Sequence, residues 1–199
     1  MTIRILYVIT NYYRNGWYCG FNPPFSDRIY YKEQMIIVER MKKISRENKK
    51  ISLTLKLHPG ADVLDEDPPW VASLKGIERI NIIRNPIFTQ LLHSHDVVLI
   101  DSPTTTLLQA IATRLPVFVL TSVISPPRVH LHLLMKRAVC ADHAEALMNR
   151  LEVYLQTGEY PADCDNREYI KLYGTHIDDG KSSQRALAVL KRTLQGGRR

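Results

Sequence analysis

The stretch at residues 96–120, DVVLIDSPTTTLLQAIATRLPVFVL, constrains the fold more than any other part of the chain. It begins with an uninterrupted apolar run at 97–100, which is too short to cross a membrane and is typical of a strand buried on both faces. A polar break follows at 101–104. Leucines and alanines then recur at helical spacing up to Pro116, and a second apolar run occupies 117–120. This order predicts a strand, a helix and a second, parallel strand.

Hydroxyl side chains gather in the first turn of this unit, at Ser102, Thr104, Thr105 and Thr106. Ligands of open α/β sheets bind at the carboxyl ends of the strands, where helix N-termini present free backbone N–H groups and a partial positive charge. A phosphate group is therefore the expected ligand of this turn. The sequence is equally consistent with hydroxyls that only cap the following helix.

The other apolar patterns predict further elements on either side of this unit. Strands are expected at 3–9, 51–57, 77–83 and 138–140, and helices at 26–48, 70–74, 88–95, 143–155 and from 182 or 183 onward. Gly158 is expected to end the helix at 143–155. The chain has neither an internal repeat nor a linker. We therefore expect one α/β domain over residues 1–199, Rossmann-like, with three layers and about six parallel strands.

A second informative stretch is KLHPG at 56–60, where a predicted strand stops. It places His58 at the carboxyl end of the sheet, and Pro59 fixes the backbone that presents the imidazole. His58 could donate to a phosphate oxygen or act as an acid or base. The alternative is an ordinary surface histidine at a strand end.

The segment at 10–26, TNYYRNGWYCGFNPPFS, is predicted to be a long loop rich in aromatic residues. Loops of this length in a compact domain are commonly lids or binding segments, or packing surfaces for a partner. Exposed aromatic side chains would favour the partner.

Composition narrows the classes of function. The net charge of +7 suits a phosphorylated ligand or an anionic membrane surface, whereas nucleic-acid binding is disfavoured because no aromatic residues alternate with the lysines. We find no apolar stretch of membrane-spanning length and no signal peptide, so we expect a cytoplasmic protein that could lie at the inner face of the membrane. Three scattered cysteines and histidines spaced two apart predict neither a disulfide framework nor a metal site.

The chain resembles the C-terminal, nucleotide-binding half of GT-B glycosyltransferases. It is similar to bacterial capsule and surface-polysaccharide biosynthesis proteins, and through them to teichoic-acid glycerophosphotransferases and polysialyltransferases. The resemblance runs through nearly the whole chain. Its most specific motifs are His-Pro at 58–59, Asp-Ser-Pro-Thr-Thr at 101–105 and Asp-Gly-Lys-Ser at 179–182.

The resemblance implies roles for individual residues. His58 would contact the phosphate of the donor, and the turn residues Ser102, Thr104 and Thr105 would hold the same group through hydroxyls and backbone amides. Related enzymes hold the donor ribose through a Glu-Ala pair. Here that pair is Gln-Ala, so Gln109 would hydrogen-bond the ribose without bringing a charge.

A GT-B enzyme also has an N-terminal half, which carries the acceptor and usually the catalytic base. The resemblance therefore implies a missing half or a partner subunit, with Asn11, Tyr12 and Arg14 of the aromatic loop in the cleft between the halves. The catalytic residues stay unassigned, although His58 is a candidate. Neither a metal nor another cofactor is required.

The expected function is the donor-binding half of a glycosyltransferase or glycerophosphotransferase in surface-polysaccharide biosynthesis. It would serve the transfer of a sugar or alditol phosphate from a nucleotide-activated donor, and the nearest look-alikes favour cytidine nucleotides. One alternative is a non-catalytic interaction module that binds a polypeptide through the aromatic loop. Another is half of a nucleotide-sugar 2-epimerase. A nicotinamide dehydrogenase is disfavoured because no GxGxxG motif follows the first strand.

Overall fold

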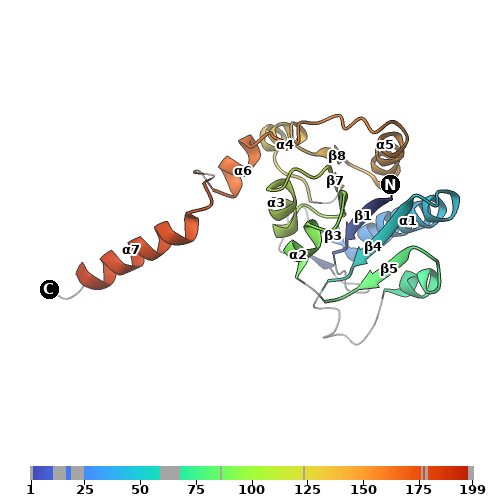
Figure 1. The fold of residues 1–199 in the computed structure, drawn as a ribbon, viewed down its shortest axis with the longest axis horizontal. Coiled ribbons are helices and arrows are strands. Elements are labelled where there is room, and N and C mark those ends of the chain that lie inside the picture. The colour runs from blue at the N-terminus through green and yellow to red at the C-terminus, as the bar shows by residue number, and fades with distance from the viewer. Residues whose placement is uncertain are drawn as a thin grey trace.

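A parallel sheet of six strands forms the centre of the computed structural model (Figure 1). The structure describes residues 2–10, 17–18, 25–58, 68–85, 87–122, 124–175, 177 and 179–196. The strands of the sheet are β1 (Ile3–Val8), β4 (Ile51–Lys56), β5 (Ile80–Ile83), β6 (Val97–Ile100), β7 (Val117–Leu120) and β8 (Val139–Ala141). Their order in space is β5-β4-β1-β6-β7-β8, and all neighbouring pairs are parallel. The predicted α/β fold with about six parallel strands is confirmed.

Helices cover both faces of the sheet, which gives the three predicted layers. The helix α1 (Asp27–Glu47), the short 3-10 helix η2 (Pro69–Leu74) and α5 (Ala144–Thr157) pack on one face. The other face is covered by α2 (Phe88–Leu92), α3 (Thr105–Ile111), α4 (Arg128–Met135) and α6 (Glu168–Tyr173). The last helix, α7 (Ser182–Gly196), extends away from these layers (Figure 1).

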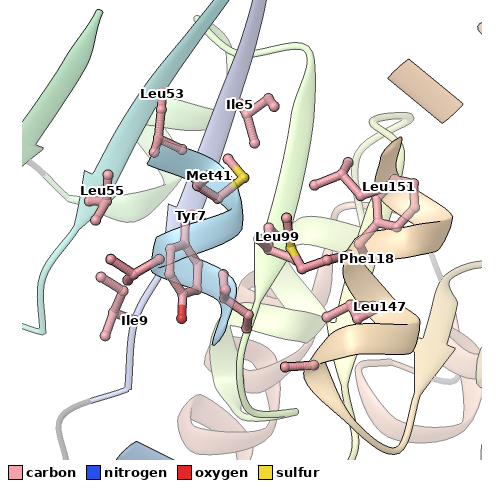
Figure 2. Packing of buried hydrophobic residues seen from close by; sticks show 14 of the residues in the cluster. Ile5, Tyr7, Ile9, Met41, Leu53, Leu55, Leu99, Phe118, Leu147 and Leu151 are labelled. Atoms are coloured by element: carbon pink, nitrogen blue, oxygen red, sulfur yellow. The ribbon is translucent and has the colours of Figure 1, made fainter. Parts of the chain in front are cut away.

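The apolar runs form the central strands because these strands are buried on both faces. All four residues of β6 are buried, and successive side chains point to opposite faces. Val97 and Leu99 belong to the core under α1 and α5, whereas Val98 and Ile100 belong to the core under α3 and α4. Figure 2 shows the first core, with Leu99 near Phe118 and residues of α5.

The strand order reverses between β1 and β6. The chain builds outward from β1 through β4 to β5 and then returns to the other side of β1 with β6. Such a reversal places two divergent connections next to each other at the carboxyl edge of the sheet, which is where ligands of open α/β sheets bind. The connections that diverge here begin at Ile9 and at Asp101.

Several element boundaries differ from the predicted ones. The strand expected at 77–83 begins at Ile80, because residues 78–79 turn and Arg79 has a left-handed φ of 67°. The helix expected at 88–95 ends at Leu92, where Ser94 donates its hydroxyl back to Leu91 O. The helix α5 ends as predicted, with Gly158 in the left-handed conformation at φ 74°.

Three features were not predicted. The helix α4 begins directly after Pro127, and Leu134 is its one buried residue. The helix α6 lies in a stretch of mixed polarity, of which Tyr169 and Ile170 are buried. Within the expected long loop, β2 (Trp17–Tyr18) pairs with β3 (Phe25–Ser26) as a short antiparallel ladder, and Ser26 caps α1 by accepting from the Arg28 N–H.

Candidate functional site

Three strands end at the same level of the carboxyl edge. The last residues of β4, β1 and β6 are Lys56, Val8 and Ile100, and they are in register across the sheet. His58, Thr10 and Ser102 therefore each stand two residues beyond the end of a strand. Adjacent strands lie about 4.8 Å apart, so this edge brings together backbone segments that are distant in the sequence.

The buried carboxylate of Asp101 occupies the point where the strand order reverses. Its side chain is 0% exposed and accepts hydrogen bonds from three residues. The Thr10 N–H donates to both oxygens, at 2.9 and 3.1 Å, and the Thr10 hydroxyl donates to Oδ1 at 2.7 Å. On Oδ2, Gln34 Nε2 donates at 2.6 Å and the Tyr7 hydroxyl at 3.4 Å. One carboxylate thus joins β1, β6 and α1.

Burial raises the pKa of Asp101 from 3.8 to about 6, because the charged form loses its hydration. The hydrogen bonds from Thr10, Gln34 and Tyr7 favour the charged form and oppose this rise. Burial, the Asp101 charge and the hydrogen bond to it raise the pKa of Tyr7 well above its ordinary value. At neutral pH the site therefore holds an ionised carboxylate surrounded by neutral donors.

The hydroxyl turn directly follows this carboxylate. Ser102 is buried, and its Oγ lies 3.5 Å from the Tyr30 hydroxyl oxygen. The side chains of Thr104 and Thr105 are exposed. Thr104 occupies the N-cap position of α3, but its side chain makes no capping hydrogen bond, and its Oγ1 lies 3.2 Å from Thr106 Oγ1. The capping role that the sequence left open is thus not filled by Thr104.

The other predicted site residues lie on the same side of the sheet or along α3. Gln109 is exposed on α3, four residues after Thr105, so the two side chains share one face of that helix. His58 is exposed beyond the end of β4. The cleft residues Asn11, Tyr12 and Arg14 lie outside the described residues.

The Asp-Gly-Lys-Ser motif lies apart from this edge, at the start of α7. Asp179 accepts from the Lys181 N–H at 2.9 Å and forms an ion pair with Arg185 at 2.7 Å. These contacts begin the helix, so the structure gives Asp179 a local role there.

Sequence reasoning did not assign Asp101, Thr10 or Gln34 to the site. The signal for Asp101 was its place directly after a strand buried on both faces. Burying an ionised group there costs free energy unless hydrogen bonds compensate it. The signal for Gln34 was a polar residue within the stripe of α1 that otherwise buries Tyr30, Ile37 and Met41.

A hollow of about 600 Å³ lies beside the outer strands β4 and β5, away from the reversal point. Its lining is partly apolar and includes two cationic side chains; the residues are Leu57, Val71, Lys75, Ile82, Ile83, Arg84 and Asn85. We place the candidate site at the reversal point, because the hydroxyl turn and its buried carboxylate are found there.

Two kinds of structure are not found in the described part of the chain. It contains no group of three or more His, Cys, Asp and Glu side chains placed to hold a metal ion. Among the same residues, no helix has both the length and the apolar character needed to cross a membrane.

The scan against protein-family models and the search of curated proteins gave no match. Among solved structures, the fold matches a UDP-N-acetylglucosamine 2-epimerase from Neisseria meningitidis bound to UDP-N-acetylglucosamine, with a TM-score of 0.62 and 14% identity. It also matches a putative UDP-N-acetylglucosamine 2-epimerase from Listeria monocytogenes, at 0.58 and 18%, and a spinosyn rhamnosyltransferase complexed with spinosyn aglycone, at 0.54 and 14%. The match to the Neisseria protein covers 96% of this chain and 45% of that protein. For the Listeria protein the two shares are 98% and 46%, and for the spinosyn rhamnosyltransferase they are 98% and 45%. The chain thus spans about half the length of these proteins and has the fold of one half of a GT-B structure.

Proposed function

We propose that this chain binds the nucleotide of an activated donor at the carboxyl edge between β1 and β6. It would serve as the donor half of a glycosyltransferase or glycerophosphotransferase of surface-polysaccharide biosynthesis. The observation that carries the proposal is the hydroxyl turn after β6, where Thr104 and Thr105 are exposed directly beside the strand-order reversal. Ligands of open α/β sheets occupy this position.

The phosphate of the donor would lie on this turn. The Thr104 and Thr105 hydroxyls are donors, and the backbone N–H groups at the start of α3 add to them. His58, beyond the end of β4, would approach the same group from the other side of β1. A phosphate that leaves with developing negative charge is stabilised by such fixed donors, and this stabilisation would be the contribution of this half to catalysis.

The acceptor and the catalytic base would come from a second half, joined to this chain or carried by a partner subunit. The helix α7 offers a surface for it. Leu187, Leu190 and Leu194 repeat at helical spacing and are 52%, 60% and 75% exposed. Because α7 extends away from the body of the fold, this apolar stripe is free to meet another surface (Figure 1).

Two observations bear on the base of the nucleotide. The resemblance favours cytidine, whereas one matched epimerase structure holds UDP-N-acetylglucosamine. A first test is a calorimetric titration of the whole chain at low salt with CMP, CDP, UDP and GDP. We expect one of them to bind, and we expect the Thr104→Ala, Thr105→Ala double variant to lose that binding.

The matched control is Thr193→Ala, which removes an exposed threonine hydroxyl from α7 and should leave the titration unchanged. If the double variant binds as the wild type does, the phosphate does not lie on the hydroxyl turn. If no nucleotide binds, the titration favours the interaction module instead, or a donor site that requires the second half. Repeating it with a candidate second half present separates these two outcomes.

Half of a 2-epimerase is the second candidate, and the structural matches to UDP-N-acetylglucosamine 2-epimerases favour it. Both candidates bind a nucleotide at the same edge, so the titration does not separate them. A product assay with a candidate second half does: a transferase releases the nucleotide and extends an acceptor, whereas an epimerase changes the sugar in the absence of any acceptor.

A further inference from the structure

We propose that Asp101 is a positioning residue for nucleotide binding. Its carboxylate holds the chain that leaves β1 and the hydroxyl turn that leaves β6 in the arrangement that receives the phosphate. The inference rests on the proposed function, because its effect is measured as affinity for a nucleotide at that turn.

On the β1 side, the carboxylate and Gln34 together hold Thr10. Both the N–H and the hydroxyl of Thr10 donate to Asp101, and the Thr10 carbonyl accepts from Gln34 Nε2 at 2.9 Å. The same amide of Gln34 donates to Asp101 Oδ2. All polar groups of Thr10 are thus engaged, so these bonds fix the backbone of Thr10 beyond the end of β1.

On the β6 side, the carboxylate belongs to the residue before the hydroxyl turn. Ser102 comes next, with its Oγ near the Tyr30 hydroxyl, and Ser102 O accepts from the Thr104 N–H at 2.8 Å. Asp101 and Ser102 are both 0% exposed. The turn that carries Thr104 is therefore anchored from its buried end, and Asp101 ties that end to β1 and α1.

The burial of Asp101 excludes a role in direct contact with the donor. Its side chain has no exposed surface, so it acts through the residues that it holds. A role in stability alone explains the residue poorly. Burying a carboxylate among neutral donors is costly, and an apolar side chain with apolar neighbours would fill such a place at least as well.

The test compares nucleotide affinity with stability. Asp101→Asn keeps the shape but places an amide N–H₂ among groups that already donate. We expect it to raise the Kd for whichever of CMP, CDP, UDP and GDP the wild type binds by roughly tenfold or more, the effect of one hydrogen bond to a charged group. The Kd is measured by calorimetry at a temperature at which circular dichroism shows each protein to be folded.

Two further variants make the result specific. Thr10→Val removes only the hydroxyl that donates to Asp101 and should weaken binding several-fold, and Thr10→Ser should restore most of that loss. Tyr160→Phe, a change of a half-buried side chain at the opposite edge of the sheet, should lower the melting temperature and leave the Kd unchanged.

The outcomes are distinct. If Asp101→Asn lowers the melting temperature but leaves the Kd within twofold of the wild type, Asp101 is structural and the inference is overturned. If Asp101→Asn does not fold, the Thr10 variants decide in the same way. If the wild type binds none of the nucleotides, either alone or with a candidate second half present, it is the proposed function that has failed.

Discussion

Each of the two edges of the central sheet holds a charged side chain that is 0% exposed, and the hydrogen bonding of these two charges differs. At the carboxyl edge, both oxygens of Asp101 accept hydrogen bonds. At the amino edge, Arg137 is also 0% exposed, and one of its terminal nitrogens donates to Thr113 O at 2.7 Å and Leu115 O at 2.9 Å. Its Nε and its other terminal nitrogen have no hydrogen-bond partner among the described residues.

The hydrogen bonds around the two charges also lead to different kinds of groups. At the amino edge, the Tyr160 hydroxyl accepts from the Val117 N–H at 3.0 Å and lies 3.0 Å from the Arg137 carbonyl oxygen. The partners in these bonds are all backbone groups next to the amino ends of β7 and β8. At the carboxyl edge, the bonds to Asp101 lead to a turn with exposed hydroxyls. The amino edge is thus a structural contact between backbone segments, whereas the carboxyl edge presents polar side chains to solvent.

The largest expected effect is that of removing the acceptor at the carboxyl edge. Asp101→Leu leaves the donors on Thr10, Gln34 and Tyr7 buried without an acceptor. We expect it to lower the free energy of unfolding by about 3–5 kcal/mol, measured by urea denaturation. A loss below about 1 kcal/mol would mean that water or a rearrangement satisfies these donors.

The next effect is a dependence of stability on pH. The folded-state pKa of Asp101 is raised from 3.8 to about 6, so the folded protein binds this proton more tightly than the unfolded chain. The stabilisation is fully present below pH 3.8 and is lost as the pH rises through 6. Between pH 4 and 7, the wild type should lose about 2–3 kcal/mol relative to Asp101→Asn.

Urea denaturation of both proteins at each pH checks this prediction. Other carboxylates with lowered pKa values, such as the half-buried Asp96 and the exposed Glu168, give the opposite slope, but they are common to both proteins and cancel in the difference. Parallel stability curves for the wild type and Asp101→Asn would show that Asp101 does not titrate in this range.

A smaller effect is expected at the amino edge. Arg137→Met removes the donor from two backbone carbonyls but also removes two buried nitrogens whose N–H bonds lack acceptors. We expect the free energy of unfolding to change by less than about 1–2 kcal/mol in either direction. A loss as large as that of Asp101→Leu, measured in the same urea series, would remove the distinction between the two edges.

The smallest effect on stability is expected at the exposed hydroxyls. The Thr104→Ala, Thr105→Ala double variant, designed for the nucleotide titration, should change the free energy of unfolding by about 0.5 kcal/mol or less, because the Thr104 side chain makes no capping bond. A loss of about 1 kcal/mol or more in the urea series would indicate a capping role after all.

The parts of the fold that the sequence predicted best are those whose environment leaves a local pattern. Strands β6 and β7 were predicted at their observed bounds because burial on both faces requires an unbroken apolar run. The helix α6 was missed because only two of its six residues are buried, so its pattern stays mixed. The positive φ of Arg79, which shortens β5, leaves no local signal because arginine rarely adopts it.

The candidate site was predictable only in part. The hydroxyl turn is a continuous stretch of sequence and could be found directly. Its support could not, because Asp101 lies 91 residues from Thr10 and 67 from Gln34, and the register of the sheet brings them together. The roles of His58 and Gln109 in binding stay predictions.

The exposed leucines of α7 have a consequence for how the chain would assemble. Burying what remains exposed of Leu187, Leu190 and Leu194 would contribute roughly 3–6 kcal/mol, before the loss of translational and rotational freedom on association. By themselves these three side chains contribute too little to hold two separate polypeptides at cellular concentrations, so a partner subunit would need further contacts besides this stripe. The same contact would be sufficient to hold a second half that is covalently linked to this chain, because a tether supplies a millimolar effective concentration.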